Sequence, residues 1–146
     1  CRIATEAVMS TGATDLPLLA RLDGEARGLP RSPVLAALLG RGHALLLERD
    51  GEAVGFGFLR RHGRGWLIGP VAADDDAAAC GLISALLAGH RCDFVRIDVP
   101  ARSGLGAWLA QLGLPHVDSG LVMVRGVLPA PSGPAHVFAL VNQAMG

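Results

Sequence analysis

The sequence contains no lysine and no tyrosine, and its only asparagine is Asn142. The absence of tyrosine excludes a phenol as the proton donor of a reaction. All 13 basic residues are therefore arginine, and they balance 13 acidic residues, so the formal net charge is zero. A neutral chain lacks the basic surface that nucleic-acid binding requires. Arginine in place of lysine, together with 20 glycines, suggests GC-rich coding and predicts a bacterial protein.

Long apolar runs and metal-type cysteine pairs are also missing. No uncharged apolar window reaches the roughly 18 residues that a membrane span needs, so none is predicted. Cys1, Cys80 and Cys92 are odd in number and lack metal-ligand spacing, which predicts no metal site and a reducing, cytoplasmic setting. The chain has 146 residues and is 51% apolar, enough for one compact domain with a core. Because it begins with Cys1 rather than methionine, we expect a piece of a longer protein.

The centre of the sequence, residues 65–89, predicts a buried strand over 66–72, a polar loop over 73–76 and a helix over 77–88. The helix has one apolar stripe at spacings of three and four residues. Asp74, Asp75 and Asp76 fall where an N-cap and a first turn should be. A strand that runs into a helix start is also where many folds hold an anionic ligand. The unit is therefore either a cofactor seat or ordinary α/β packing.

The segments before this centre alternate between helix and strand patterns. Asp50 and Gly51 favour a hairpin turn because both tolerate positive φ. Gly55 and Gly57 alternate with Phe56 and Phe58, which predicts either a close approach of another group to the strand or a bulge. The predicted elements are a strand over 2–9, helices over 16–23 and 34–39, and strands over 43–49 and 53–60.

The segments after the centre predict a strand, a helix and a hairpin. Residues 93–99 alternate, with Phe94, Arg96 and Asp98 on one face. A helix over 104–112 follows, and then strands over 114–118 and 121–126. Residues 128–134 predict an extended linker, and 135–145 a short amphipathic helix. The order predicts an α/β domain over residues 1–126, with a mixed sheet and helices on both faces. Residues 127–146 would be a linker and helix packing on it.

Three segments carry a resemblance to a known family. They are GFGFLR at residues 55–60, IGPVA at 68–72 and MVRG at 123–126. With the order of elements, they resemble the GCN5-related N-acetyltransferases (GNAT). The similarity runs from about Arg2 to Gly126. Within that family, they look like the second domain of proteins in which two GNAT domains are joined in tandem.

The resemblance implies a centrally splayed sheet that binds acetyl-CoA as a substrate. In the family, the strand equivalent to 67–72 diverges from its parallel neighbour, here 94–99, and acetyl-CoA lies in the gap. Pantetheine amides pair with the strand backbone, and the pyrophosphate rests on the next helix start. The residues implied to bind the cofactor are Ile68, Gly69, Pro70, Val71, Ala72, Ala78, Gly81 and Leu82.

The sequence departs from the family pattern at the cofactor loop and at two other positions. Ala78 stands where the family has Arg or Gln, and Ile83 where it has a second Gly or Ala. Leu109 lies near the position of a tyrosine that often protonates the leaving thiolate, and Arg102 or Ser103 replaces an asparagine. The aspartates at 74–76 also place negative charge near the expected phosphates.

Two candidate catalytic side chains remain, each with a structural alternative. Asp98, at the end of the strand beside the gap, could take a proton from an amine as general base, or pair with Arg96 or Arg102. His62, in a hairpin loop, could contact the acceptor or act as base, or be a solvated turn residue.

Two functions stay open. One is an N-acetyltransferase that acts on an amine of a small molecule or peptide. The other is a non-catalytic GNAT half that docks on an upstream GNAT domain and shapes its acceptor site. The expected protein partner is a tandem GNAT domain or a second copy in a homodimer, without nucleic acid or membrane.

Overall fold

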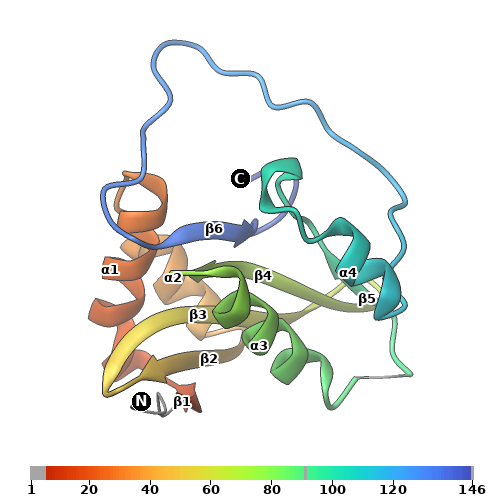
Figure 1. The fold of residues 1–146 in the computed structure, drawn as a ribbon, viewed down its shortest axis with the longest axis horizontal. Helices are drawn as coiled ribbons and strands as arrows, with labels where there is room; N and C mark the ends of the chain where they lie inside the picture. Colours follow the sequence, from red (N-terminus) through yellow and green to blue (C-terminus); the bar gives the residue numbers. More distant parts are fainter. Residues whose placement is uncertain (1–5, 91, 146) are drawn as a thin grey trace, which may run out of the picture.

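The computed structural model describes residues 6–90 and 92–145 (Figure 1). Five strands follow one another across the sheet in the order β1-β2-β3-β4-β5, and β6 also pairs with β4. The strands are β1 (Glu6–Thr11), β2 (Gly42–Arg49), β3 (Glu52–His62), β4 (Gly65–Ala73), β5 (Val95–Ile97) and β6 (His136–Ala139). The α-helices are α1 (Leu16–Arg27), α2 (Ser32–Leu39), α3 (Asp76–Leu87) and α4 (Gly106–Gln111).

Antiparallel hairpins build the first four strands. Asp50 (φ 53°) and Gly51 (φ 84°) form the turn between β2 and β3, as their tolerance of positive φ predicts. Between β3 and β4 the register shifts, because Gly57 faces Val71 and Leu59 faces Ile68. One residue of β3 therefore opposes two of β4, which places a bulge in the middle of β4.

Helices cover both faces of the sheet, as predicted. One core forms where α3 and α4 pack on one face, around Leu82, Ile83 and Leu109. The other core lies under α1 and α2, around Leu19, Leu35 and the edge-to-face rings of Phe56 and Phe58. The glycines Gly55 and Gly57 lie under α3, where an added Cβ would approach Leu82 or Leu86 to 3.0 Å. Their close approach is therefore to a helix of the same domain.

Several predicted boundaries differ from those of the structure, most clearly those of the first helix and of β5. The first helix continues through Gly24 to Arg27 and ends at Gly28 (φ 73°). An interior glycine costs only about 1 kcal/mol, and the Arg21–Glu25 pair at 2.9 Å spans it. β5 covers three residues instead of seven, because β4 diverges from it after Ile68. The predicted strand over 2–9 is β1 from Glu6, and its first residues lie outside the described chain.

Two predictions near the C-terminus are wrong. Residues 114–126 form no hairpin but an exposed connection, and β-prone segments without a partner strand do not form a sheet. The predicted helix over 135–145 is instead the strand β6, followed by residues 140–145 in neither helix nor strand. A short apolar run fits a buried helix or a buried strand equally well. Here it forms a strand because the edge of β4 that β5 leaves uncovered offers backbone hydrogen-bond partners.

The fold class is thus the predicted mixed α/β sheet with helices. The division at residue 126 stays a prediction, although β6 beyond it belongs to the sheet. Within the described residues, no helix combines the length and the apolar character needed to cross a bilayer.

Candidate functional site

The predicted gap between β4 and β5 is present. The two strands pair in parallel only from Trp66 to Ile68 on β4 and from Val95 to Ile97 on β5. Beyond Ile68 the strands separate, and the second half of β4 has an edge that β5 does not cover. We name this gap, along residues 69–73 of β4, the split.

The split is filled by the chain itself. β6 runs antiparallel to β4 along the split, with Val71 facing Ala139 and Ala72 facing Val137. After β6, the backbone N–H of Leu140 donates to the carbonyl of Asp98 at 2.8 Å. The C-terminal segment therefore bridges the separated strands, on the same edge of β4 that β5 pairs with earlier.

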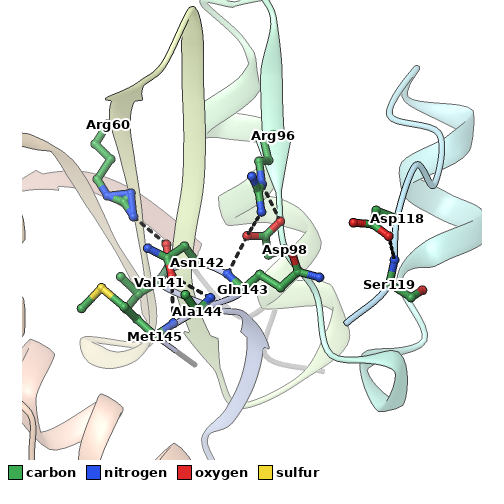
Figure 2. Close-up of polar contacts among 10 residues, drawn as sticks. All are labelled: Arg60, Arg96, Asp98, Asp118, Ser119, Val141, Asn142, Gln143, Ala144 and Met145. Atoms are coloured by element: carbon green, nitrogen blue, oxygen red, sulfur yellow. Dashed lines mark hydrogen bonds and ion pairs between the residues drawn. The ribbon is translucent and has the colours of Figure 1, made fainter. Parts of the chain in front are cut away.

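Burial holds β6 in place. Its side chains reach both cores, because Phe138 and Ala139 lie in the core under α3, and Val137 lies in the core under α1 and α2, which Val141 beyond the strand also joins. The buried guanidinium of Arg60 donates to the carbonyl of Val141 at 2.6 Å (Figure 2). Burial lowers the pKa of Arg60, and the Asp98 carboxylate opposes that shift. The strand is thus an integral part of the core.

Gly69 lets the C-terminal segment approach the bulge of β4. Its φ is +144°, and an added Cβ would come within 2.0 Å of the carbonyl oxygen of Leu140. No other residue type could hold this backbone conformation at this distance without displacing one of the two strands. The glycine of the IGPVA segment is therefore explained by contact with residues 140–141 of the same chain.

The strand residues predicted to bind the cofactor face an edge that is already paired. Ile68 pairs with Ile97 of β5, whereas Val71 and Ala72 pair with β6. Gly69 and Pro70 form the buried bulge between these two pairings. In the family, pantetheine amides pair with this strand backbone, and here a peptide strand lies at that edge instead.

The start of α3 is capped by its own aspartate, as predicted. Asp75 Oδ1 accepts the Ala78 N–H at 2.8 Å, and Arg49 Nη1 donates to Asp75 Oδ2 at 2.7 Å. The bond from Arg49 and then that from Ala78 hold the pKa of Asp75 below its usual range. A carboxylate thus already occupies the positive end of the helix dipole.

The remaining residues that were predicted to contact the cofactor do not form a phosphate-binding site. The Ala78 N–H is taken by Asp75, and the Leu82 side chain is fully buried in the core. Gly81 lies on the exposed side of α3, with open space around it. Burial and the neighbouring Glu25 raise the pKa of Asp74. These groups do not fit the pyrophosphate of acetyl-CoA.

Asp98 is held by two partners (Figure 2). Arg96 donates to both carboxylate oxygens, at 2.8 Å to Oδ1 and 3.0 Å to Oδ2. Oδ2 also accepts the backbone N–H of Gln143 at 2.9 Å. The predicted ion pair with Arg96 is therefore present, and the carboxylate fastens the segment that follows β6.

His62 lies at the exposed end of β3, beside an open hollow. The hollow has a volume of about 350 Å³ and is lined by His62, Arg96, Asn142, Gln143 and Ala144. The structure thus brings His62 near the partners of Asp98, but no hydrogen bond joins these two residues among the described contacts. The floor of the hollow is the C-terminal turn, in which Asn142 Oδ1 accepts the N–H groups of Ala144 and Met145.

Sequence reasoning missed Arg60 and β6, which decide what the split can hold. Arg60 ends the GFGFLR segment, and its position on a strand otherwise buried could have suggested an internal partner. The run VFALV at residues 137–141 could have suggested a strand. The residues that the structure describes include no group of three or more potential metal ligands.

In this mixed sheet β4 diverges from β5, and helix α3 begins shortly after β4 ends. This arrangement is typical of acetyltransferase folds. Residues 19–139 match the family described as "Acetyltransferase (GNAT) domain". The chain belongs to this family. No curated protein matches it significantly.

Solved structures share the fold at low identity. The ribosomal-protein-S18-alanine N-acetyltransferase from Escherichia coli is 16% identical with a TM-score of 0.65, covering 97% of this chain and 99% of that one. The aminoglycoside N-acetyltransferase AAC(6')-Iy in complex with CoA is 14% identical with a TM-score of 0.62, covering 85% and 97%. A ribosomal-protein-alanine N-acetyltransferase from Brucella melitensis biovar Abortus 2308 is 16% identical with a TM-score of 0.59, covering 84% and 100%.

Proposed function

We propose that this chain is a GNAT domain that does not bind acetyl-CoA and acts by docking on a second GNAT domain, whose acceptor site it shapes. The observation that carries this proposal is the pairing of β6 with the edge of β4 along the split. The strand occupies the position that the family gives to pantetheine, so its own peptide backbone replaces the cofactor as the partner of β4.

Energetics support a split that stays closed. Removing β6 together with the residues that follow it would expose Val137, Phe138 and Val141, which are all buried. Each such side chain contributes about 1.5–3 kcal/mol by its burial, so release costs roughly 5–9 kcal/mol. A ligand with micromolar affinity supplies about 8 kcal/mol, and millimolar affinity corresponds to about 4 kcal/mol. Even the lower cost would therefore weaken a micromolar site beyond about 1 mM.

Electrostatics act in the same direction. Asp75 and its partner Arg49 already satisfy the start of α3. A pyrophosphate at this helix start would have to displace a carboxylate from the Ala78 N–H while facing Asp74 and Asp76. Like charges so close repel, and the repulsion grows as water is excluded.

A second candidate is an acetyl-CoA-dependent N-acetyltransferase acting on an amine of a small molecule or peptide. The divergence of β4 from β5 favours it, since the split exists even though β6 fills it. Similar folds include enzymes named for aminoglycoside and ribosomal-protein acceptors. In this candidate β6 would leave the split, residues 68–72 would meet the cofactor, and Asp98 or His62 would serve as base. A bacterial, cytoplasmic setting stays a prediction for either candidate.

Calorimetric titration of acetyl-CoA into the chain separates the two. The first proposal expects an affinity weaker than about 1 mM, equivalent to about 4 kcal/mol. Saturation at micromolar concentrations would overturn it in favour of the transferase. The variant Asp75→Arg serves as the matched test of charge, because it removes the carboxylate but leaves β6 in place. The first proposal expects the affinity of this variant to stay weaker than about 1 mM, because β6 still fills the split, whereas micromolar binding by the variant would show that charge alone keeps acetyl-CoA out.

A further inference from the structure

Apolar side chains lie exposed on the long connection between α4 and β6. This connection arcs away from the rest of the molecule, and residues 114–135 form neither helix nor strand (Figure 1). Unstructured loops longer than about 12–15 residues are uncommon in compact domains unless they have a function. We name residues 121–128 the apolar arc. It exposes six large apolar side chains: Leu121, Val122, Met123, Val124, Val127 and Leu128.

Both ends of the apolar arc are held against the domain. At one end, a Cβ added to Gly120 would come within 2.6 Å of the side-chain nitrogen of Gln143. Beyond the other end, the N–H of Ser132 donates to the carbonyl of Glu25 on α1 at 2.8 Å. The connection leaves beside α4 and β5 and then arches over the domain to α1 (Figure 1). Its middle has no partner strand in the described chain.

The composition of the apolar arc is that of a strand. Residues 121–124 read Leu-Val-Met-Val, a β-prone run that is buried on both faces when it occurs in a sheet. Leu121 is 89% exposed and Val127 is 95% exposed. Contiguous apolar surface of this kind marks a site of association.

A matching strand edge lies at the end of the sheet. β5 is the last strand in the order, and among the described residues it pairs only with β4. Phe94, which precedes β5, is 70% exposed, while its carbonyl accepts the Trp66 N–H at 2.9 Å. An open edge beside an exposed aromatic ring is a template for an added strand.

We propose that the apolar arc of one copy adds as a strand to the β5 edge of a second copy, and the reverse, forming a two-fold dimer. The partner is a second copy because each chain carries both the segment that adds as a strand, the apolar arc, and the edge that receives a strand, β5. In a two-fold dimer each arc therefore pairs with the β5 edge of the other copy. Six side chains at about 100 Å² each give roughly 600 Å² per copy, and Phe94 adds to it. A standard interface buries about 800 Å² per partner. This inference goes beyond the proposed function: it concerns how two copies of this chain associate, and its observations do not depend on whether the split binds acetyl-CoA.

Sedimentation equilibrium of the whole chain tests the dimer. The unsubstituted chain is expected to form dimers with a dissociation constant of about 100 µM or lower, as weak specific complexes do. Val122→Asp is expected to weaken dimerisation at least ~10-fold. The matched control is Val8→Asp on β1, the opposite edge strand, where Val8 is also exposed; it is expected to leave the dimer intact. Thermal midpoints of both variants should match that of the parent when all are measured as monomers.

Amide hydrogen exchange locates the contact. Residues 121–125 are expected to be protected in the dimer and to exchange rapidly in Val122→Asp. A monomeric parent chain would overturn the proposal, as would a dimer that only Val8→Asp dissociates. Protection of residues 121–125 in a monomer would also overturn it, because the arc would then pair within its own chain. None of these readouts uses acetyl-CoA, so failure of the dimer and failure of the closed split are separate results.

Discussion

The carboxylate of Asp98 accepts the backbone N–H of Gln143 at 2.9 Å. Arg96 fixes the same carboxylate through two further bonds. The residue proposed as a general base thus fastens the segment that closes the split. The carboxylate of Asp98 accepts three hydrogen bonds from its own chain, so its role in this structure is to hold the C-terminal turn. A substrate amine could reach this carboxylate only after the C-terminal turn had moved.

Replacement of Asp98 tests this role. Asp98→Ala should lower the free energy of unfolding by about 1–3 kcal/mol, since it leaves the Gln143 N–H and Arg96 without their acceptor. Urea denaturation measures the change. The matched control is Asp118→Ala, because Asp118 is exposed and, within the described part of the chain, its carboxylate accepts a hydrogen bond only from the N–H of Ser119. Equal stability of the two variants would mean that Asp98 does not hold the C-terminal segment.

A glycine pair tests the contact between β4 and the C-terminal segment. Gly69→Ala should destabilise the fold by more than 1 kcal/mol, roughly the scale of backbone strain alone, because the new Cβ would also meet the Leu140 carbonyl. Gly81→Ala is the control on the exposed side of α3, where nothing lies within 4 Å of the new Cβ. It should stabilise the helix by about 0.5–1 kcal/mol. Thermal or urea unfolding that shows Gly69→Ala to be neutral would contradict the close approach.

The pH dependence of stability should reveal the cap of α3. The folded state holds the pKa of Asp75 below its ordinary value of 3.8, chiefly through the bond from Arg49. Its stabilising contribution is therefore complete above the unfolded pKa and is lost as the pH falls through the folded pKa. Asp75→Asn should flatten the loss of stability below about pH 4.

The control for this pH series is Asp76→Asn. Asp76 lies in the first turn of the same helix, so its loss removes an equal charge at the same helix end. Unfolding should be followed by urea titration at several pH values, because Glu6 shares Arg49 and contributes a background common to both variants. If Asp76→Asn reduced the loss of stability at acid pH as strongly as Asp75→Asn does, the bond between Arg49 and Asp75 would not be the cause of that loss.

Local patterns predicted the centre of the fold well. The hairpin at Asp50 and Gly51 and the Asp75 cap follow from backbone conformation and from the unpaired N–H groups of a helix start. The helix over 77–88 follows from its apolar stripe, and the structure places α3 within one residue of that prediction at each end. These features depend on residues close in sequence, which is why the sequence alone identifies them.

The content of the split could not be predicted in the same way. The VFALV run fits a helix or a strand, and its partner, Val71, lies more than 60 residues away along the chain. The resemblance placed a cofactor at that edge, and nothing in the local sequence indicated that a strand of the same chain pairs there. Only the three-dimensional pairing reveals that β6 takes the edge, and the burial of Arg60 against Val141 follows from it.

The most direct test of the closed split is amide hydrogen exchange across β6 and at Leu140, with and without saturating acetyl-CoA. The Leu140 N–H donates to the Asp98 carbonyl, and β6 pairs with β4, so these amides should exchange slowly. We predict the same slow rates in the presence of acetyl-CoA. Selective loss of this protection on addition of acetyl-CoA, with the rest of the sheet unchanged, would show that the cofactor displaces β6 and would contradict the account.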